Sequence, residues 1–413
     1  MFRVFSIPVR FFIALLIYFS WGPLAGGVVT APVPEFSSPA LIPYPSKVVR
    51  GAGEAGFRSV HVKVGSDVPG RDDLMKEIKD IFRTSGIQGS LNSGGAAEGA
   101  MTWELFPDAR MKGEGYDLSV GLGKATVRAG SFGGFFNALQ TLRQLVFNRE
   151  GEFAMPVVRI SDKPAFVLRG IMLDVGRYYM SPALIKEVMR RLSRYKINTL
   201  HLHLTDDPAW RLEVKKYPAL TDGAFHWKSR LPGRFYTQAQ LKDLTDYCAR
   251  LNIQVIPEID MPGHSQPFAR AMKTGMQTEK GVSILKDVVD EAVSLFPGRF
   301  FHMGSDEAHI SMKDFIPRMA EHIRGKGKEV VVWSPGGPHD KDSVLMCWGE
   351  NEAGARMDKN MKRIDSNGFY IDWADSQSGV YQVFFQQPCE VPQGDDKALG
   401  AIMPVWCDGN LSS

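Results

Sequence analysis

Short apolar runs alternate with longer amphipathic segments from about residue 166 onward. Segments with helical spacing, such as 182–195 and 237–251, separate several of these runs. The runs with the length and composition of buried strands are 167–175, 197–205, 253–260, 299–305, 329–335, 343–349, 362–366 and 399–407. Strands that alternate with helical connections in this way predict an α/β fold, a (β/α)8 TIM barrel over residues 163–413.

The last part of this pattern is irregular. The connection between residues 335 and 343 is too short for a full helix, and the chain stops six residues after Cys407, where a closing helix would normally follow. We therefore expect a barrel that is truncated at its carboxyl end or that closes without this helix.

The segment before the barrel mixes strand and helix patterns with glycine turns. Its first part, residues 32–45, is rich in proline and serine and predicts a linker. The elements expected after it are a strand at 60–64, a helix at 72–86, two strands around a glycine turn in 115–131 and a second helix at 132–146. The pattern predicts a small α/β domain over residues 32–162.

The first residues combine a basic start with an apolar run of about a dozen residues, which is typical of a signal peptide. We place this signal peptide at residues 1–31, with Ala25 and Ala31 as candidate cleavage positions. The alternative is an anchoring helix, but Pro23 and the neighbouring glycines shorten the apolar run. We expect export to the periplasm, the cell surface or the medium.

Charge and cysteine content exclude two functional classes. The formal net charge is only +3, and Arg3 and Arg10 of the leader supply two of these charges, so no basic footprint for nucleic acid is present. A zinc cluster is not expected, because the cysteines form no C-x-x-C pair: they are Cys248, Cys347, Cys389 and Cys407. Disulfides remain open in an exported protein.

Polar and aromatic residues gather where the predicted barrel strands end, and barrel enzymes carry their active sites at those ends. They are Asp174, Arg177, Asp206, Asp207, Asp260, His264, Asp306, Glu307, Trp333, Trp348, Tyr370, Asp372 and Trp406. Indole faces stack on the apolar face of a sugar ring, and carboxylates and arginine bind its hydroxyls. A single tryptophan is as compatible with core packing, but three at one mouth favour a carbohydrate-binding cleft.

Three stretches carry a resemblance to a known family: residues 169–221, "PEIDMPGHS" at 257–265 and "HMGSDE" at 302–307. With residues 114–146, they resemble glycoside hydrolase family 20, the β-N-acetylhexosaminidases, over roughly residues 40–408. The resemblance implies an exo-acting, retaining enzyme that releases terminal GlcNAc or GalNAc from glycans or chitooligosaccharides and needs no cofactor. In this family the substrate's own 2-acetamido group is the nucleophile, and an oxazolinium forms.

The resemblance also implies roles for the two adjacent carboxylates. Glu307 would be the general acid and then the general base, and Asp306 would orient the acetamido group and stabilise the cation. A negative neighbour and partial burial raise the pKa of an acid, so we expect a protonated Glu307 beside an ionised Asp306.

The remaining roles also follow from the resemblance alone. Arg177 would bind the hydroxyls at carbons 3 and 4, and Asp206 would pair with His264 beside the acid. The other residues implied in support or substrate binding are Asp260, Trp333, Trp348, Tyr370, Asp372, Trp406 and Asp408. Two positions depart from the family pattern, because Ser305 replaces a glycine and Asp408 replaces a glutamate.

Other interpretations stay open. Arg177 alone could form a structural ion pair with Asp174, and His264 alone could be a capped loop histidine. His201 and His203 have the H-x-H form of some metal-dependent barrel hydrolases, with Asp306 as a further ligand. A glycan-binding barrel without catalysis is the alternative from another class, motivated by Ser305 and Asp408.

Overall fold

The computed structural model describes residues 40–91, 96–149, 151–349, 358–370 and 386–408. Predicted segments outside these ranges are the signal peptide and the first part of the linker. Among the described residues, no helix has the length and apolar character needed to cross a membrane.

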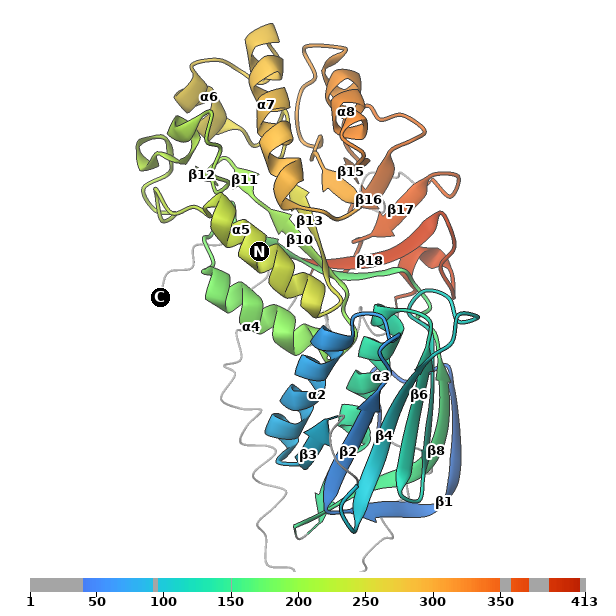
Figure 1. The fold of residues 1–413 in the computed structure, drawn as a ribbon. Coiled ribbons are helices and arrows are strands. Elements are labelled where there is room, and N and C mark those ends of the chain that lie inside the picture. Colours follow the sequence, from blue (N-terminus) through green and yellow to red (C-terminus); the bar gives the residue numbers. More distant parts are fainter. Residues whose placement is uncertain (1–39, 92–95, 150, 350–357, 371–385, 409–413) are drawn as a thin grey trace, which may run out of the picture. The chain divides into compact units, whose positions relative to one another are not determined.

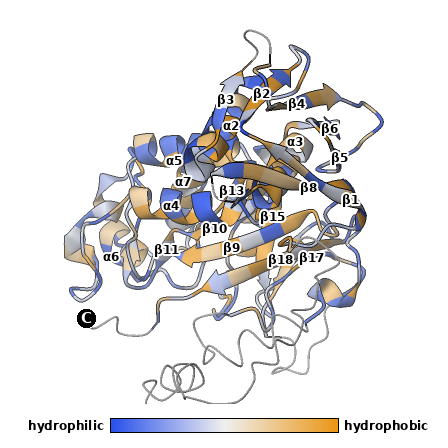
Figure 2. Ribbon diagram, turned by 90° about the horizontal axis from the view of Figure 1, so that it is seen from below, coloured by the Kyte–Doolittle hydropathy of each residue, from blue (hydrophilic) through white to orange (hydrophobic). Residues whose placement is uncertain are grey.

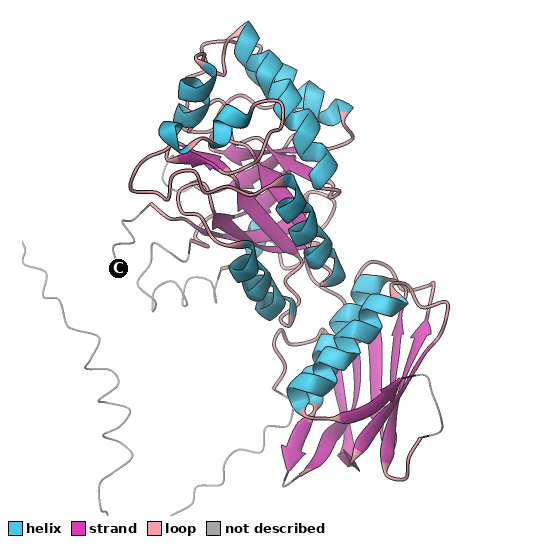
Figure 3. Ribbon diagram, turned by 60° about the vertical axis from the view of Figure 1, so that its left-hand side comes forward, coloured by secondary structure: helices cyan, strands magenta, loops and turns pink. Residues whose placement is uncertain are grey.

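The small domain is a twisted sheet with two helices on one face (Figure 3). The strand order is β1-β8-β5-β6-β4-β2-β3, and β7 pairs with β8 outside this path. The strands are β1 (Lys47–Phe57), β2 (Ser59–Val64), β3 (Gln88–Leu91), β4 (Ala100–Pro107), β5 (Tyr116–Gly121), β6 (Lys124–Ala129), β7 (Phe147–Arg149) and β8 (Glu152–Asp162). The helices are α2 (Arg71–Ser85) and α3 (Phe132–Leu145). Both predicted helices and the predicted strands are present, whereas β1, β3, β4, β7 and β8 were not predicted.

Eight parallel strands form a closed barrel in the order β10-β13-β14-β15-β16-β17-β18-β9. They are β9 (Leu168–Asp174), β10 (Thr199–His203), β13 (Gln254–Glu258), β14 (Phe300–His302), β15 (Glu329–Ser334), β16 (Val344–Cys347), β17 (Lys362–Asp365) and β18 (Ala398–Val405). Seven of them lie within one of the runs identified in the sequence, and β18 begins one residue before its run, so the TIM-barrel prediction is confirmed. Closure comes from β18, which pairs with β17 on one side and β9 on the other.

Helices lie along the outside of the barrel strands (Figure 1). They are α4 (Pro182–Ser193), α5 (Gln238–Arg250), α6 (Gln266–Met272), α7 (Glu279–Leu295) and α8 (Phe315–Gly325). Local signals fix where they begin: Ser181 caps α4, and Thr237 and Gln240 form a reciprocal capping box at α5. The described connection from β15 to β16 has no helix, as its length predicted.

Hydrophobic packing accounts for the barrel's two layers. In Figure 2 the barrel strands β9 and β18 are mainly hydrophobic, whereas the helices around the barrel carry both hydrophilic and hydrophobic positions. Because successive strand residues point to opposite faces, one set packs under the helices and the other fills the barrel. The inner set includes Met172, Ile256, Val331 and Ile364, all buried.

All four cysteines lie in the described part of the chain, and each is a buried free thiol. The question of disulfides is therefore answered for this structure: none is formed. Burial raises the pKa of Cys248 to about 12 and that of Cys389 to about 11, which keeps both thiols protonated.

Candidate active site

A cavity of about 250 Å³ lies where the barrel strands end. The residues that line it are Arg177, His203, Asp260, His264, Asp306, Glu307, Trp333, Trp348, Tyr370, Trp406 and Asp408. Every predicted site residue is therefore at the cavity except two. Asp206 lies behind it and contacts three of the lining residues, and Asp372 lies outside the described residues.

Aromatic rings form one wall of the cavity. The ring of Trp406 is 5.7 Å from that of Trp333 and 6.3 Å from that of Tyr370, the latter at an interplanar angle of 74°. Two of the cavity's indoles are held by hydrogen bonds: the N–H of Trp333 donates to Glu258 (2.7 Å), and that of Trp348 donates to the carbonyl of Pro335 (3.0 Å). The apolar ring faces are thus fixed in place, as stacking on a sugar requires.

Arg177 is held by three carboxylates and one indole. Its guanidinium lies 3.1 Å from Asp174, 3.0 Å from Asp206 and 3.0 Å from Asp408, and 4.9 Å from the ring of Trp406. These charges raise the pKa of Arg177 against the opposing effect of its burial. Arg177 forms the ion pair with Asp174 and also lines the cavity, so the two interpretations of this residue are compatible.

A second set of contacts leads to Glu307. Asp206 lies 3.4 Å from Nδ1 of His264, and Nε2 of the same ring lies 3.3 Å from Glu307. The hydrogen bond to Asp206 is the main reason that the pKa of His264 is raised to about 10. His264 is therefore a cation at neutral pH, and the predicted pairing of Asp206 with His264 is present.

The loop after β14 separates the two adjacent carboxylates. Gly304, Ser305 and Glu307 have φ values of 66°, 83° and 48°, so the chain turns sharply there. A Cβ at Gly304 would collide with the carboxylate of Asp260, which explains why this position is glycine. The turn directs Asp306 toward buried carboxylates and leaves the Glu307 side chain 59% exposed beside His264.

The environments of the two carboxylates differ from the expectation. We expected partial burial of Glu307 and an ionised Asp306, but Asp306 is the less exposed of the two side chains. Burial, followed by repulsion from Asp260 and Glu258, raises the pKa of Asp306 to about 8. Burial and the charge of Glu258 likewise raise the pKa of Asp260 to about 7. A proton is therefore retained by this pair near neutral pH in the unliganded protein.

Two charged residues that sequence reasoning did not assign to the sugar site belong to its surroundings: His203 lines the cavity, and Glu258 is fully buried next to it. Glu258 contacts His203 (2.7 Å), and His203 contacts Asp206 (2.9 Å). The sequence offered one signal for His203. It lies two residues after His201 in the same predicted strand, so both side chains point to the same face of the sheet, the barrel interior. Both histidines are fully buried and lie beside Glu258, as expected for core histidines.

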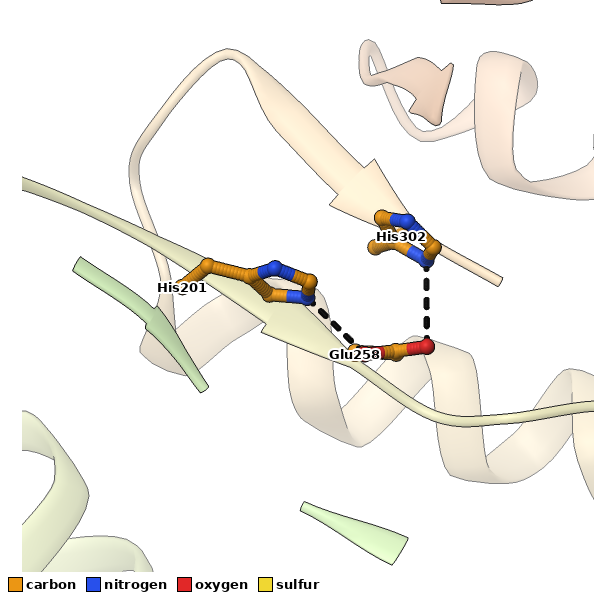
Figure 4. Close-up of side chains that lie close together, drawn as sticks. All are labelled: His201, Glu258 and His302. Carbon is orange, nitrogen blue, oxygen red and sulfur yellow. Dashed lines mark ion pairs between the residues drawn. The ribbon is translucent and has the colours of Figure 1, made fainter. Parts of the chain in front are cut away.

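A buried group of two histidines and one glutamate has the residue types of a metal site but differs from the set expected from the sequence. His201, Glu258 and His302 lie close together (Figure 4). The oxygens of Glu258 already accept from Nδ1 of His203 and from the Trp333 indole. Nδ1 of His302, which faces Glu258, already accepts from the backbone N–H of Gly304. Some of these donor atoms are thus engaged in hydrogen bonds, and Asp306, which the metal-dependent alternative names as a ligand, is not part of this group.

The comparisons with known proteins agree with this geometry. The family description "Glycosyl hydrolase family 20, catalytic domain" matches residues 166–280, and "Glycosyl hydrolase family 20, domain 2" matches residues 38–163. Together the two matches cover more than half of the chain.

The chain belongs to glycoside hydrolase family 20.

Relatives of the chain include two bacterial β-hexosaminidases. The chain is 29% identical to that of Vibrio furnissii and 32% identical to that of Porphyromonas gingivalis, over 71% and 72% of its own length. It spans only 61% and 48% of the lengths of these two relatives. Among solved structures, the N-acetyl-β-hexosaminidase of Streptomyces plicatus, in complex with Thio-NAglucal, is 26% identical with a TM-score of 0.77. That match covers 90% of this chain and 86% of the other.

Ser305 is a strained departure from the family 20 pattern. It has φ 83°, a conformation that favours glycine, and its fully buried hydroxyl has no hydrogen-bond partner. Replacing Ser305 by glycine is expected to stabilise the protein by about 1–3 kcal/mol, because both the strain and the unpaired hydroxyl are removed. Thermal unfolding of the two proteins measures this. A Ser305→Gly protein with an unchanged or lower Tm would mean that the hydroxyl has a partner in solution.

Proposed function

We propose that the protein is an exo-acting, retaining β-N-acetylhexosaminidase that releases terminal GlcNAc or GalNAc from glycans or chitooligosaccharides. The observation that carries this proposal is the pair Asp306 and Glu307, which face one cavity in two different environments. The cavity volume lies just below the roughly 300 Å³ at which ligand pockets usually begin. This size suits one sugar ring held at a chain end.

Glu307 is proposed to transfer the protons. In the first step it protonates the glycosidic oxygen while the C1–O bond breaks and the acetamido oxygen attacks C1. In the second step it takes a proton from the water that attacks C1 and opens the oxazolinium ring. Two inversions at C1 give a product of retained configuration. The exposed position of Glu307, beside His264, leaves room for the leaving group and for this water.

Asp306 is proposed to orient the acetamido group. An ionised Asp306 accepts a hydrogen bond from the acetamido N–H and faces the positive charge that develops on the oxazolinium. Binding of the N–H and this charge both favour the ionised form, which offsets the raised pKa of the unliganded protein. Tyr370, at the same cavity, is proposed to hydrogen-bond the acetamido oxygen and direct it toward C1.

The rest of the cavity supports recognition of a single terminal sugar. Arg177 is proposed to bind the hydroxyls at carbons 3 and 4, and Asp408 the outer hydroxyls. Trp333, Trp348 and Trp406 are proposed to enclose the sugar ring and the acetamido methyl group. A mutant β-hexosaminidase of Streptomyces plicatus, 27% identical with a TM-score of 0.76, has been solved in complex with its product GlcNAc. Its match covers 89% of this chain and 85% of the other, which supports the same substrate class here.

The proposal is tested by the release of 4-nitrophenol from the β-N-acetylglucosaminide and the β-N-acetylgalactosaminide. We expect turnover of at least one compound, at a rate unaffected by a chelator, and the ratio of the two rates gives the sugar preference. Loss of activity with the chelator would favour the metal-dependent hydrolase. Binding of GlcNAc by a folded protein without turnover would favour the glycan-binding barrel instead.

We further propose that the protein is exported. The basic start and the apolar run of the first residues support this. Fractionation of cells that produce the full chain is expected to place the activity in the periplasm, on the surface or in the medium. Activity confined to the cytoplasm would contradict export.

A further inference from the structure

Glu258 forms a buried ion pair with His203, one of the residues that line the cavity. The side chains are 0% and 1% exposed, and Nδ1 of His203 lies 2.7 Å from Glu258. The other ring nitrogen, Nε2, lies 2.9 Å from Asp206. Because ionised carboxylates can only accept hydrogen bonds, both ring nitrogens must carry a proton. His203 is therefore a buried imidazolium, and its pKa is raised by these carboxylates against the effect of burial.

This pair is connected to the proposed acid by an unbroken series of contacts. Glu258 contacts His203, His203 contacts Asp206, Asp206 contacts His264, and His264 contacts Glu307. Carboxyl and imidazole groups alternate along the whole series. A change of charge at its buried end therefore acts on groups that are proposed to touch the substrate.

His201 provides a comparison within the same strand. It lies two residues before His203 on β10, is fully buried, and its Nε2 lies 2.9 Å from the same oxygen of Glu258. It has no contact with Asp206, and burial lowers its pKa to about 4. His201 is therefore neutral at the pH at which His203 is charged.

We propose that Glu258 and His203 are positioning residues: a buried ion pair of zero net charge that sets the charge on the carboxylates of the active site. Since this inference concerns the pH range of the reaction, it rests on the proposed function. His203 offsets the negative charge of Asp206, and Glu258 in turn keeps His203 charged. Neither residue need take part in a bond-making step.

Asp306 is the group through which this effect is measured. The charged and titratable groups around it come from several barrel strands and their loops. Glu258 and Asp260 come from β13 and its end, and His264 and Glu307 come from the loops after β13 and β14. The other charged or titratable groups at the same cavity are Arg177, His203, Tyr370 and Asp408. Glu258, Asp260 and Glu307 raise its pKa, whereas His264 lowers it.

The sign of each substitution follows from this balance. His203→Gln removes one buried positive charge, so the pKa of the active-site carboxylates rises. Glu258→Gln combined with His203→Gln removes both charges of the pair, so the net charge of the buried group is restored to that of the wild type. His201→Gln removes a neutral ring and changes no charge.

The experiment is the pH dependence of kcat/KM for 4-nitrophenyl β-N-acetylglucosaminide, in stopped assays. His203→Gln is expected to move the acid-side midpoint to higher pH by about one unit, the effect of one charge at this range in a partly screened interior. The double variant is expected to return the midpoint to the wild-type value, and His201→Gln to leave it in place.

Each outcome decides the question. A His203→Gln protein that loses rate without moving its midpoint, or a double variant that fails to restore it, overturns the inference. If His203→Gln does not fold, the double variant decides the question alone. A folded double variant with the wild-type midpoint supports the inference, and one that fails to fold or has a shifted midpoint contradicts it. A wild type without turnover would instead contradict the proposed function, so the two failures are distinguishable.

Discussion

Replacing Glu307 by glutamine is expected to lower kcat/KM by about 10² or more on a chitooligosaccharide, the effect usual for loss of a general acid. Glutamine keeps the size of the side chain and its place beside His264 but has no proton to transfer. With a 4-nitrophenyl leaving group the loss is expected to be smaller in the first step, because this group departs with little protonation. The measurement is a comparison of the two substrates with wild type and variant.

A matched control is Glu187→Gln, which makes the same chemical change at an exposed helical position paired with Arg191. This variant is expected to keep wild-type rates on both substrates. Equal losses for Glu307→Gln on both substrates would contradict the role of an acid toward the leaving group. Full activity of the variant would remove Glu307 from the mechanism.

Replacing Asp306 by asparagine is expected to lower kcat/KM by about 10²–10³ whatever the leaving group, because the lost charge stabilises the oxazolinium rather than the departing oxygen. The dependence on the leaving group therefore separates the two neighbours. The kinetics of both variants on aryl glycosides and chitooligosaccharides measure this. A loss limited to poor leaving groups would assign the acid to Asp306 instead.

The same variant is expected to be more stable than the wild type at alkaline pH. The folded-state pKa of Asp306 is raised to about 8, above the ordinary value of 3.8, so the folded state holds a proton that the unfolded state has lost. Stability from this group is present at low pH and is lost as the pH rises from about 4 to about 8. Asparagine removes that loss, so the gain in Tm over wild type should grow from pH 5 to pH 9. A gain that does not depend on pH would contradict the raised pKa.

The barrel was predictable because its strands are short, apolar and bounded by polar ends. The sheet of the small domain was harder to predict. β1 is rich in glycine and largely exposed, so its sequence has almost no alternation. β4 does alternate, with every second residue from Met101 to Leu105 buried. A count of alternating apolar and polar positions would have predicted this strand. β8 pairs with β1 and β5, which lie far from it in sequence, and such pairings have no local signal.

The candidate site was also predictable only in part. The types of residue at the strand ends predicted the cavity, since a parallel barrel brings these ends to one mouth. The different burial of Asp306 and Glu307 could not be read from their adjacency. It depends on three residues with positive φ, Gly304, Ser305 and Glu307, in the loop after β14, and this backbone conformation is set by tertiary packing. Glu258 was overlooked because it precedes the visible strand end by two residues.

The four buried thiols have a practical consequence for handling the protein. Reagents that modify exposed cysteines should leave the native chain unlabelled, since none of its thiols is accessible. A cysteine introduced at Leu122, which is 81% exposed in the turn between β5 and β6, would then be the sole point of attachment. Such a variant could carry one dye or be fixed to a solid support in a single orientation, with every native residue of the active site retained.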